Sequence, residues 1–417
     1  MANNRSLTNV AILFTEKIIV LFLGFITTLL LARQLGPEVF GQYSVILASA
    51  FMFFPLTQMG LNNLCGKYFS LYPNNLHYYF RAALAIRITF SALALCLVTL
   101  VHLFYSQHST SLLILLLVLL QSANCVSHVE FAFLSNENAK TTALIRIFTK
   151  LFCKVSLLYL ISINASLTLL ILFTGLEYLL SAIGYIWIYR RHNYHYKIGS
   201  RTSIKHVASK LFHQSKWLAL SGFASIIYLK IDQVMIAYYL NHKAVGEYAA
   251  ALKFSELWFV FPTIVANILM PKLVNLYKRD RFKFWDFQRK LITLSTVSSL
   301  LLITIFALSA NSLIFYIYGT EYSNSALILK VHITATLFIF FRAFLSKWLI
   351  LSRNYNLSLY SHCLGAVVNI ILNALLIPTY GTVGAAVASV IAYFVSSILF
   401  LFLFERGRVF IKNYIGN

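Results

Sequence analysis

Three basic residues in one apolar segment have the spacing and the chemistry to attract an anion. Arg146, Lys150 and Lys154 recur every four residues, so on a helix they lie along one face. At 1.5 Å per residue, Lys154 lies about 12 Å further along that helix than Arg146. A row of unpaired cations would draw in phosphate or pyrophosphate. The alternative is that the side chains extend to lipid head groups, which fits Arg146 well and Lys154 poorly.

Other charged residues also interrupt long apolar segments. An ionised side chain at the centre of a membrane helix costs about 2.5–3.5 kcal/mol, so we expect these residues to face a polar interior. The acids among them could bind a proton or Na⁺, or could form structural ion pairs between helices, and the sequence leaves both alternatives open. The acidic residues are Glu16, Glu130, Glu177, Asp232 and Glu256, and the further basic residues are Lys17, Arg87, Lys230, Lys253, Lys330, Arg342 and Lys347.

Motifs for catalysis or metal binding do not stand out. The five cysteines form no CxxC pair, which argues against a zinc site and a disulfide framework. We find no D-x-D, no nucleophile motif and no cluster with metal-ligand spacing. We therefore expect no enzymatic activity, no metal and no cofactor.

The composition indicates an all-α integral membrane protein. Of 417 residues 59% are hydrophobic and 11% are charged, whereas soluble domains have about 25% charged residues. Twelve apolar segments are long enough to cross a bilayer, which takes roughly 20 residues, and backbone groups in hydrocarbon must bond within helices. The segments are Thr8–Arg33, Phe40–Gly66, Phe80–Phe104, Ser111–Leu134, Thr142–Ile163, Leu167–Tyr189, Lys216–Leu240, Gly246–Met270, Leu291–Tyr318, Ala326–Leu351, Leu357–Ile377 and Val383–Phe404.

The loops predict the orientation. With the N-terminus inside, the inside loops and tails hold 22 Lys and Arg, and the outside loops hold two. This asymmetry places both termini in the cytoplasm. It also accounts for the net charge of +22, so we do not expect a nucleic-acid partner. The inside segments Arg190–Ser215 and Pro271–Lys290 are basic and amphipathic, as expected for connectors on an anionic lipid leaflet.

The two halves of the chain share a motif. Leu31–Tyr43 reads L-A-R-Q-L-G-P-E-V-F-G-Q-Y and Ile236–Tyr248 reads I-A-Y-Y-L-N-H-K-A-V-G-E-Y. Four residues match at a constant offset of 205, and Asn62 matches Asn267 at the same offset. Because the halves have equal span numbers and equal orientation, the repeat is parallel, which is typical of transporters. The predicted domains are a six-helix lobe at 1–190, a connector at 191–215, a second six-helix lobe at 216–404 and a cytoplasmic tail at 405–417.

These motifs resemble those of one family. Leu31–Ser44, Lys230–Ile236 (K-I-D-Q-V-M-I), Val245–Lys253 (V-G-E-Y-A-A-A-L-K) and Leu376–Ala388 (L-I-P-T-Y-G-T-V-G-A-A-V-A) look like signatures of O-antigen and polysaccharide-repeat flippases. That family belongs to the multidrug/oligosaccharidyl-lipid/polysaccharide (MOP) exporter superfamily. Span number and motifs extend the resemblance over most of the chain.

The resemblance implies a fold of two pseudo-symmetric six-helix lobes, like multidrug and toxin extrusion (MATE) transporters, that open alternately to either side. It implies transfer of undecaprenyl-pyrophosphate-linked repeat units across a bacterial inner membrane, coupled to an ion gradient, with other O-antigen assembly proteins as possible partners. The cationic-lumen candidates are Arg146, Lys150, Lys154, Lys230 and Arg87; the ion-coupling candidates are Asp232, which is the best positional match, and Glu16, Glu177 and Glu256.

Three alternatives remain open. A multidrug–cation antiporter of the same superfamily would need an acidic cavity, yet basic residues in the spans exceed acidic ones ten to five. A membrane enzyme such as a polymerase of this pathway would be expected to have a large periplasmic loop, and the outside loops are all short. A scaffold for the assembly proteins is compatible with transport.

Overall fold

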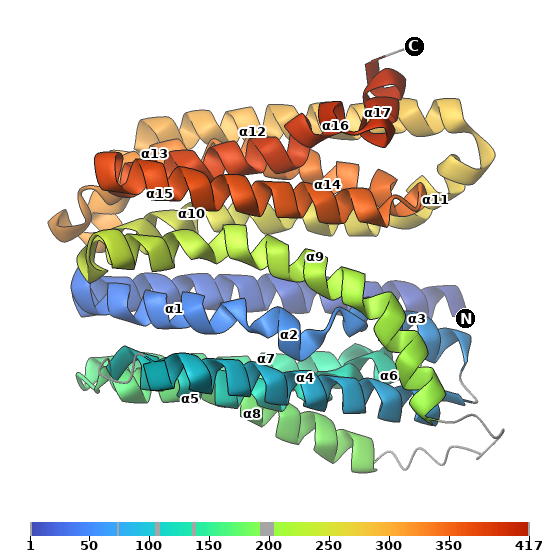
Figure 1. Ribbon diagram of the computed structural model, residues 1–417, viewed down its shortest axis with the longest axis horizontal. Helices are drawn as coiled ribbons and strands as arrows, with labels where there is room; N and C mark the ends of the chain where they lie inside the picture. The colour runs from blue at the N-terminus through green and yellow to red at the C-terminus, as the bar shows by residue number, and fades with distance from the viewer. Residues whose placement is uncertain (1, 73–74, 105–108, 136–138, 192–203, 416–417) are drawn as a thin grey trace. The chain divides into compact units, whose positions relative to one another are not determined.

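The computed structural model describes the backbone of residues 2–72, 75–104, 109–135, 139–191 and 204–415, and these residues fold into helices without a strand. Figure 1 shows the long helices as coiled ribbons. The chain divides into two compact units. The first comprises residues 1–31 and 46–223, and the second comprises residues 32–45 and 224–417. Each unit thus has its own core, and a short piece of the N-terminal half belongs to the second.

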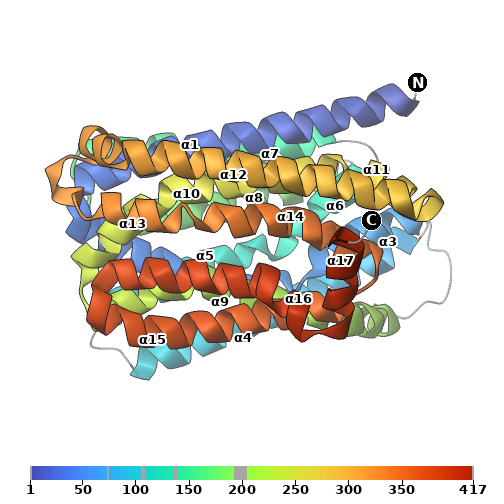
Figure 2. The same cartoon turned by 90° about the horizontal axis from the view of Figure 1, so that it is seen from above.

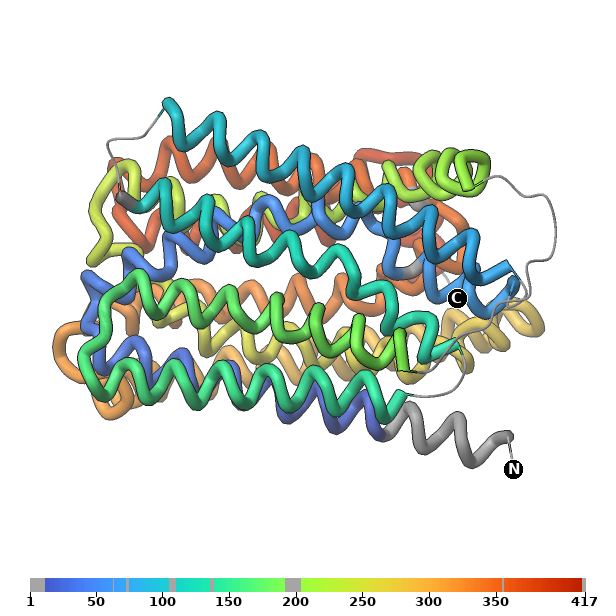
Figure 3. The backbone as a smooth tube through the Cα atoms, turned by 90° about the horizontal axis from the view of Figure 1, so that it is seen from below, coloured from blue at the N-terminus to red at the C-terminus, as the bar shows by residue number. Residues whose placement is uncertain are grey.

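The first unit contains seven whole helices and parts of two longer ones. It takes the beginning and the end of α1 (Ala2–Met52), and the first part of α9 (Ile204–Tyr239). The whole helices are α2 (Phe54–Gln58), α3 (Leu61–Leu71), α4 (Leu76–Phe104), α5 (Ser109–Ser122), α6 (Val129–Ser135), α7 (Ala139–Ser162) and α8 (Leu167–Arg191), with a 3₁₀ turn at Ala123–His128. In Figure 3, α7 runs beside α8 and beside the beginning of α1.

The second unit takes the middle of α1, the rest of α9 and the helices that follow. These are α10 (His242–Ile268), α11 (Met270–Arg279), α12 (Arg281–Tyr318), α13 (Ser325–His332), α14 (Ala335–Leu351), α15 (Tyr355–Phe394), α16 (Phe400–Leu403) and α17 (Glu405–Ile415), with short turns at Thr320–Tyr322 and Val395–Leu399. α12 begins where the Asp280 carboxylate accepts from the Lys283 backbone N–H at 3.0 Å. That hydrogen bond holds the pKa of Asp280 below its ordinary value.

Two glycines interrupt the longest helices. Gly36 has φ 68° within α1, and Gly381 has φ 60° within α15. Residues with a Cβ rarely adopt such angles, whereas glycine does so without steric cost. Both glycines lie in predicted outside turns, so the sequence located these breaks.

The number of spans depends on how such breaks are counted. The described residues contain eight helical runs long and apolar enough to cross a membrane, or nine if the bent pair Thr320–His332 and Ala335–Leu351 forms one span. Two of those runs, Ile12–Gln58 and Asn356–Leu403, each extend over most of two of the predicted segments. α7, which carries the basic row, is not among the eight. The prediction of twelve spans therefore remains a prediction.

The repeated motif has a packing explanation. Gly41 and Gly246 are equivalent positions of the repeat. A Cβ on Gly41 would lie 1.7 Å from the His242 carbonyl oxygen, and a Cβ on Gly246 would lie 1.9 Å from the Pro37 carbonyl oxygen. Each glycine thus allows the backbone of the other motif to approach, which explains why both copies carry it.

Candidate functional site

Arg146, the first residue of the basic row on α7, is held by two carboxylates. Its Nε and Nη2 donate to the two oxygens of Glu16 at 3.0 and 2.9 Å. Its Nη1 pairs with Glu130 on α6. Glu16 on α1 is buried, with 5% of its surface exposed. The guanidinium therefore joins three helices of the first unit through a bidentate bond and a second ion pair.

The two lysines of the row share one acid. Lys150 Nζ lies 2.5 Å from Glu177 Oε1, and Lys154 Nζ lies 3.6 Å from Glu177 Oε2. Glu177 lies on α8, the neighbour of α7. Lys154 is the most loosely held cation of the row, because its partner is already bound to Lys150.

The expectation of an unpaired row was wrong. Three cations on α7 meet three carboxylates from α1, α6 and α8, so the row as a whole is neutral. The geometry matches the structural ion-pair alternative for Glu16 and Glu177. Glu130, which was not among the site candidates, is a third partner. Spacing along α7 located the row, but the partners come from segments up to 130 residues away.

Arg87 on α4 has a different environment. It is completely buried, donates to Ser127 Oγ at 2.8 Å and donates to Asn62 Oδ1. Its Nε has no partner, and no carboxylate of the described residues forms a salt bridge with it. Among the described residues of the first unit, Arg87 is thus a buried cation without a salt-bridge partner. Asn62, which reaches it, is exposed.

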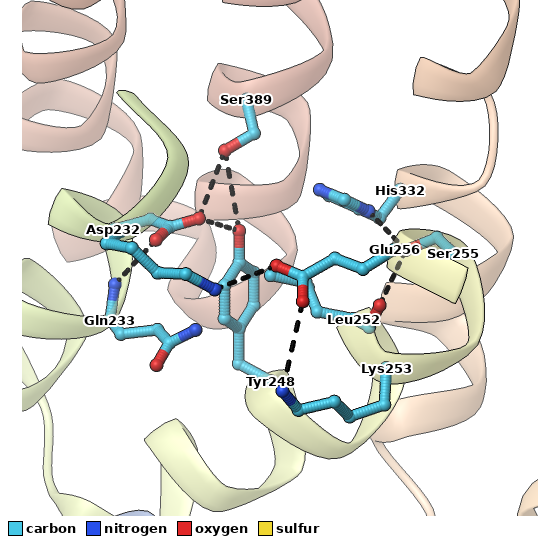
Figure 4. Close-up of polar contacts among 10 residues, drawn as sticks. Asp232, Gln233, Tyr248, Leu252, Lys253, Ser255, Glu256, His332 and Ser389 are labelled. Carbon is cyan, nitrogen blue, oxygen red and sulfur yellow. Dashed lines mark hydrogen bonds and ion pairs between the residues drawn. The ribbon is translucent and has the colours of Figure 1, made fainter. Parts of the chain in front are cut away.

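In the second unit, two lysines share Glu256 on α10. Lys230 Nζ lies 2.9 Å from Glu256 Oε1, and Lys253 Nζ lies 3.9 Å from Glu256 Oε2. Figure 4 shows Glu256 between the two ammonium groups. The two ammonium groups thus share one carboxylate. Glu256, an ion-coupling candidate, is therefore a counter-ion in this geometry.

Asp232 lies two residues from Lys230 and contacts other partners. Its carboxylate accepts from the Tyr248 hydroxyl, from Ser389 Oγ at 3.3 Å and from the Gln233 backbone N–H at 2.8 Å. These contacts appear in Figure 4. Asp232 is 1% exposed, and no described cation lies within 4.0 Å of it. It is a buried carboxylate that is held by hydrogen-bond donors and forms no salt bridge with a described cation.

A chain of buried polar groups continues from Asp232 along α15. Asn369 donates to Ser389 Oγ at 3.4 Å, and Asn373 donates to Asn369 Oδ1 at 3.1 Å. The Oδ1 atom of Asn373 has no hydrogen-bond partner among the described residues. Sequence analysis missed these residues. The available signal was two asparagines four residues apart in an otherwise apolar segment.

Two further cations of the second unit lack a carboxylate partner among the described residues. Arg342 on α14 donates to Ser361 Oγ at 2.7 Å, to the Ser396 carbonyl and to His362 at 3.1 Å. Lys347 on the same helix is 8% exposed and donates to Asn267 Oδ1 at 2.5 Å. Asn267 is the repeat equivalent of Asn62, so the same asparagine contacts a buried cation in each half.

The described residues offer no place for a metal held by histidine, cysteine and carboxylate ligands. No three such side chains gather within them. What the interior can do, by its chemistry, is attract an anion with its unpaired cations and bind a proton or small cation at Asp232.

The comparison with protein families decides the identification. The family described as polysaccharide biosynthesis protein matches residues 6–276. The chain belongs to this family. Among curated polysaccharide biosynthesis and flippase proteins, it is 23% identical over 195 residues to the probable low-salt glycan biosynthesis flippase Agl15 of Haloferax volcanii. It is also 23% identical over 190 residues to the capsular polysaccharide biosynthesis protein CapF of Staphylococcus aureus.

These matches cover part of each polysaccharide biosynthesis protein. The alignment with Agl15 covers 46% of this chain and 41% of Agl15, and the alignment with CapF covers 45% of this chain and 48% of CapF. The chain therefore spans less than half the length of either relative. The fold similarity extends further. The lipid II flippase MurJ in an inward closed conformation matches 98% of this chain and 90% of its own, with a TM-score of 0.71 and 18% identity.

An inward-facing multidrug resistance MATE transporter of the MOP superfamily matches 94% of this chain and 95% of its own, with a TM-score of 0.69 and 12% identity. This member of the polysaccharide biosynthesis family is therefore an all-α, multi-pass membrane protein with the fold shared by MurJ and the MATE transporters. That fold and the family resemblance were predicted from the motifs, and both are confirmed.

Proposed function

We propose that this chain is a flippase for lipid-linked oligosaccharides. Its substrate is an undecaprenyl-pyrophosphate-linked O-antigen repeat unit, which it moves from the cytoplasmic to the periplasmic leaflet of a bacterial inner membrane by alternating access. Both termini lie in the cytoplasm, and residues 1–190 and 216–404 act as the two lobes. Support comes from the polysaccharide biosynthesis family, from relatives named as flippases and from the MurJ-like fold.

The observation that carries the proposal is the excess of cations in the spans. Arg87, Arg342 and Lys347 are bound by neutral groups only, within the described residues. A buried cation without a counter-ion is costly, and a passing pyrophosphate would supply the missing negative charge. Of the residues predicted to bind the anion, Arg87 fits this role best. Lys154 and Lys230 are the next candidates, because each shares its acid with a second lysine.

Ion coupling is assigned to Asp232. A buried carboxylate without a salt bridge is stabilised by a proton or by Na⁺, so its occupancy would follow the ion gradient. The nearby oxygens of Ser389, Asn369 and Asn373 could complete a small-cation site. The other three acids proposed for coupling are engaged with cations and are weaker candidates.

The test is a translocation assay with the full chain in proteoliposomes. The vesicles contain an undecaprenyl-pyrophosphate-linked oligosaccharide, and a glycosidase added outside digests only the outward-facing sugars. Wild-type protein is expected to make the inner-leaflet substrate accessible over time, faster with an imposed ion gradient. Protein-free vesicles provide the baseline.

The same vesicles distinguish the multidrug alternative. A cationic dye should not be transported, since the interior carries excess positive charge. Dye movement without substrate movement would contradict the flippase proposal and would favour a cation antiporter.

A further inference from the structure

A cavity at one end of the second unit lies away from the polar residues described above. It has a volume of about 430 Å³, within the range of small-molecule pockets, about 300–1,000 Å³. Its walls come from the start of α12, the end of α14 and the helices α11 and α17, which meet in Figure 2. The lining residues are Tyr277, Arg281, Trp285, Trp348, Ser352, Asn354, Arg406, Val409 and Asn413.

The cavity exists because α17 folds back. The chain leaves the helical conformation at Phe404, and a Cβ on Gly407 would lie 2.5 Å from the Leu401 carbonyl oxygen. Glycine at this position therefore lets α17 approach the end of α16. Phe410 then inserts its buried ring against Trp348 and Trp285, with centroids 5.1 and 5.5 Å apart.

Two guanidinium groups give the cavity its chemistry. Arg281 lies over the ring of Tyr277, with Cζ 3.3 Å from the centroid, and Arg406 donates to Asn354 Oδ1 at 3.1 Å. Neither arginine forms a salt bridge with a described carboxylate, whereas the neighbouring Asp280 and Asp286 pair with lysines. The stacked arginine keeps its donors available, since cation–π contact leaves the N–H edge free.

The surroundings indicate where a ligand would come from. Large apolar side chains near the cavity are exposed, among them Phe282 (70%), Phe402 (56%) and Leu403 (58%). An apolar surface beside two arginines, at the end of membrane helices, is the arrangement expected at the level of lipid head groups. Ser352 and Asn413 add polar atoms suited to a glycerol hydroxyl.

We propose that this cavity binds a phosphate group, and that the phosphate belongs to the head group of an anionic phospholipid such as phosphatidylglycerol. The two guanidinium groups bind the phosphate oxygens, and the acyl chains lie along the exposed apolar side chains. This site is independent of the proposed flippase activity, because it lies outside the transport residues and binds a constituent of the membrane.

The experiment uses the purified full chain in detergent and brominated lipids, which quench nearby tryptophans. Trp285 and Trp348 line the cavity, so brominated phosphatidylglycerol should quench the wild type at a concentration about tenfold lower than brominated phosphatidylcholine does. R281Q/R406Q should lose this preference. The matched control is R279Q/R408Q, which removes one charge from the end of α11 and one from α17, at exposed positions that do not line the cavity.

Two further measurements address folding and the source of the phosphate. Val409→Phe fills the cavity and keeps both arginines, so it should also weaken quenching, while size-exclusion profiles confirm that each variant is folded. Glycerol 3-phosphate in excess should compete with the lipid in the wild type. Equal preference in R281Q/R406Q and wild type, or equal loss in the control, overturns the proposal. Binding of soluble phosphate without lipid preference overturns the assignment to a lipid.

Discussion

At Arg87, a guanidinium is buried with only neutral partners, and this has a direct consequence for function. If the substrate phosphate supplies its counter-charge, Arg87→Gln should reduce the translocation rate about 10–100-fold, since a charge-assisted hydrogen bond contributes about 1.5–3 kcal/mol. The vesicle assay with glycosidase measures the rate. Lys17→Gln removes an exposed charge from a span and should leave the rate unchanged. An unaltered rate in Arg87→Gln would exclude a substrate role for this residue.

Arg146 is expected to stabilise the folded protein through its ion pairs. Arg146→Gln leaves Glu16 and Glu130 without their cation, and removing one member of a buried pair costs about 3–5 kcal/mol. Glu16→Gln should cost less, because Glu130 still neutralises the arginine. Thermal unfolding in detergent measures both variants. The triple variant that neutralises all three residues should regain part of the loss; a triple variant less stable than Arg146→Gln would refute the ion-pair interpretation.

Asp232 should determine the dependence on an ion gradient. Asp232→Asn keeps an acceptor for Tyr248 and removes the negative charge, so translocation should become insensitive to an imposed proton or Na⁺ gradient. The assay compares rates with and without each gradient. Glu321→Gln, an exposed acid of the same unit, is the control. Gradient-stimulated transport in Asp232→Asn would assign coupling elsewhere.

At the scale of the element, the two motif glycines are the most constrained positions. Gly41→Ala or Gly246→Ala would place a Cβ less than 2 Å from a backbone oxygen, which a helix cannot relieve by a side-chain rotation. Overpacking typically lowers the free energy of unfolding by about 1–3 kcal/mol, and we expect a loss at or above the upper end of this range. Yield of monodisperse protein and thermal unfolding measure it.

Gly24 and Gly222 provide the matched controls. Both lie in helices, and a Cβ at either would meet nothing within 4 Å. Alanine should be neutral or slightly stabilising there, because it favours the helix by about 1 kcal/mol. If all four substitutions behaved alike, reciprocal packing would not explain the motif.

Sequence predicted the elements well where a local signal exists. Apolar length located the helices, and Gly36 and Gly381 located the turns. The bend between α13 and α14 was missed, because no proline or glycine lies at the break in Ile333–Thr334. The partners of Arg146 were missed for another reason. Helical spacing identifies residues on one face, but it does not identify which helix packs against that face.

At the scale of the whole molecule, the charge distribution predicts the topology. The 22-to-2 asymmetry of Lys and Arg predicts that both termini lie inside. Reporter fusions that are active only in the cytoplasm should therefore be active at residue 417 and inactive when inserted after Lys243. A reporter that is inactive at residue 417 and active after Lys243 would contradict the predicted orientation.

The repeat also shows one difference between the two halves. At the offset of 205, Asp232 corresponds to Thr27, a buried residue that donates to the Leu23 carbonyl at 2.7 Å. The carboxylate proposed for coupling therefore occurs in one copy. Sequence alone revealed the repeat and Asp232, whereas the polar chain through Ser389 and Asn369 required the packing of α9, α10 and α15.

The assignment of residues 32–45 to the second unit limits how this chain can be divided. A gene cut at the central connector would encode a C-terminal fragment that lacks the segment into which Gly246 packs, and an N-terminal fragment with that segment left without its partner. Neither fragment would therefore be expected to fold stably on its own. Co-expressed fragments would have to reassemble by complementation, because each half of the chain supplies a segment that the other half needs in order to pack.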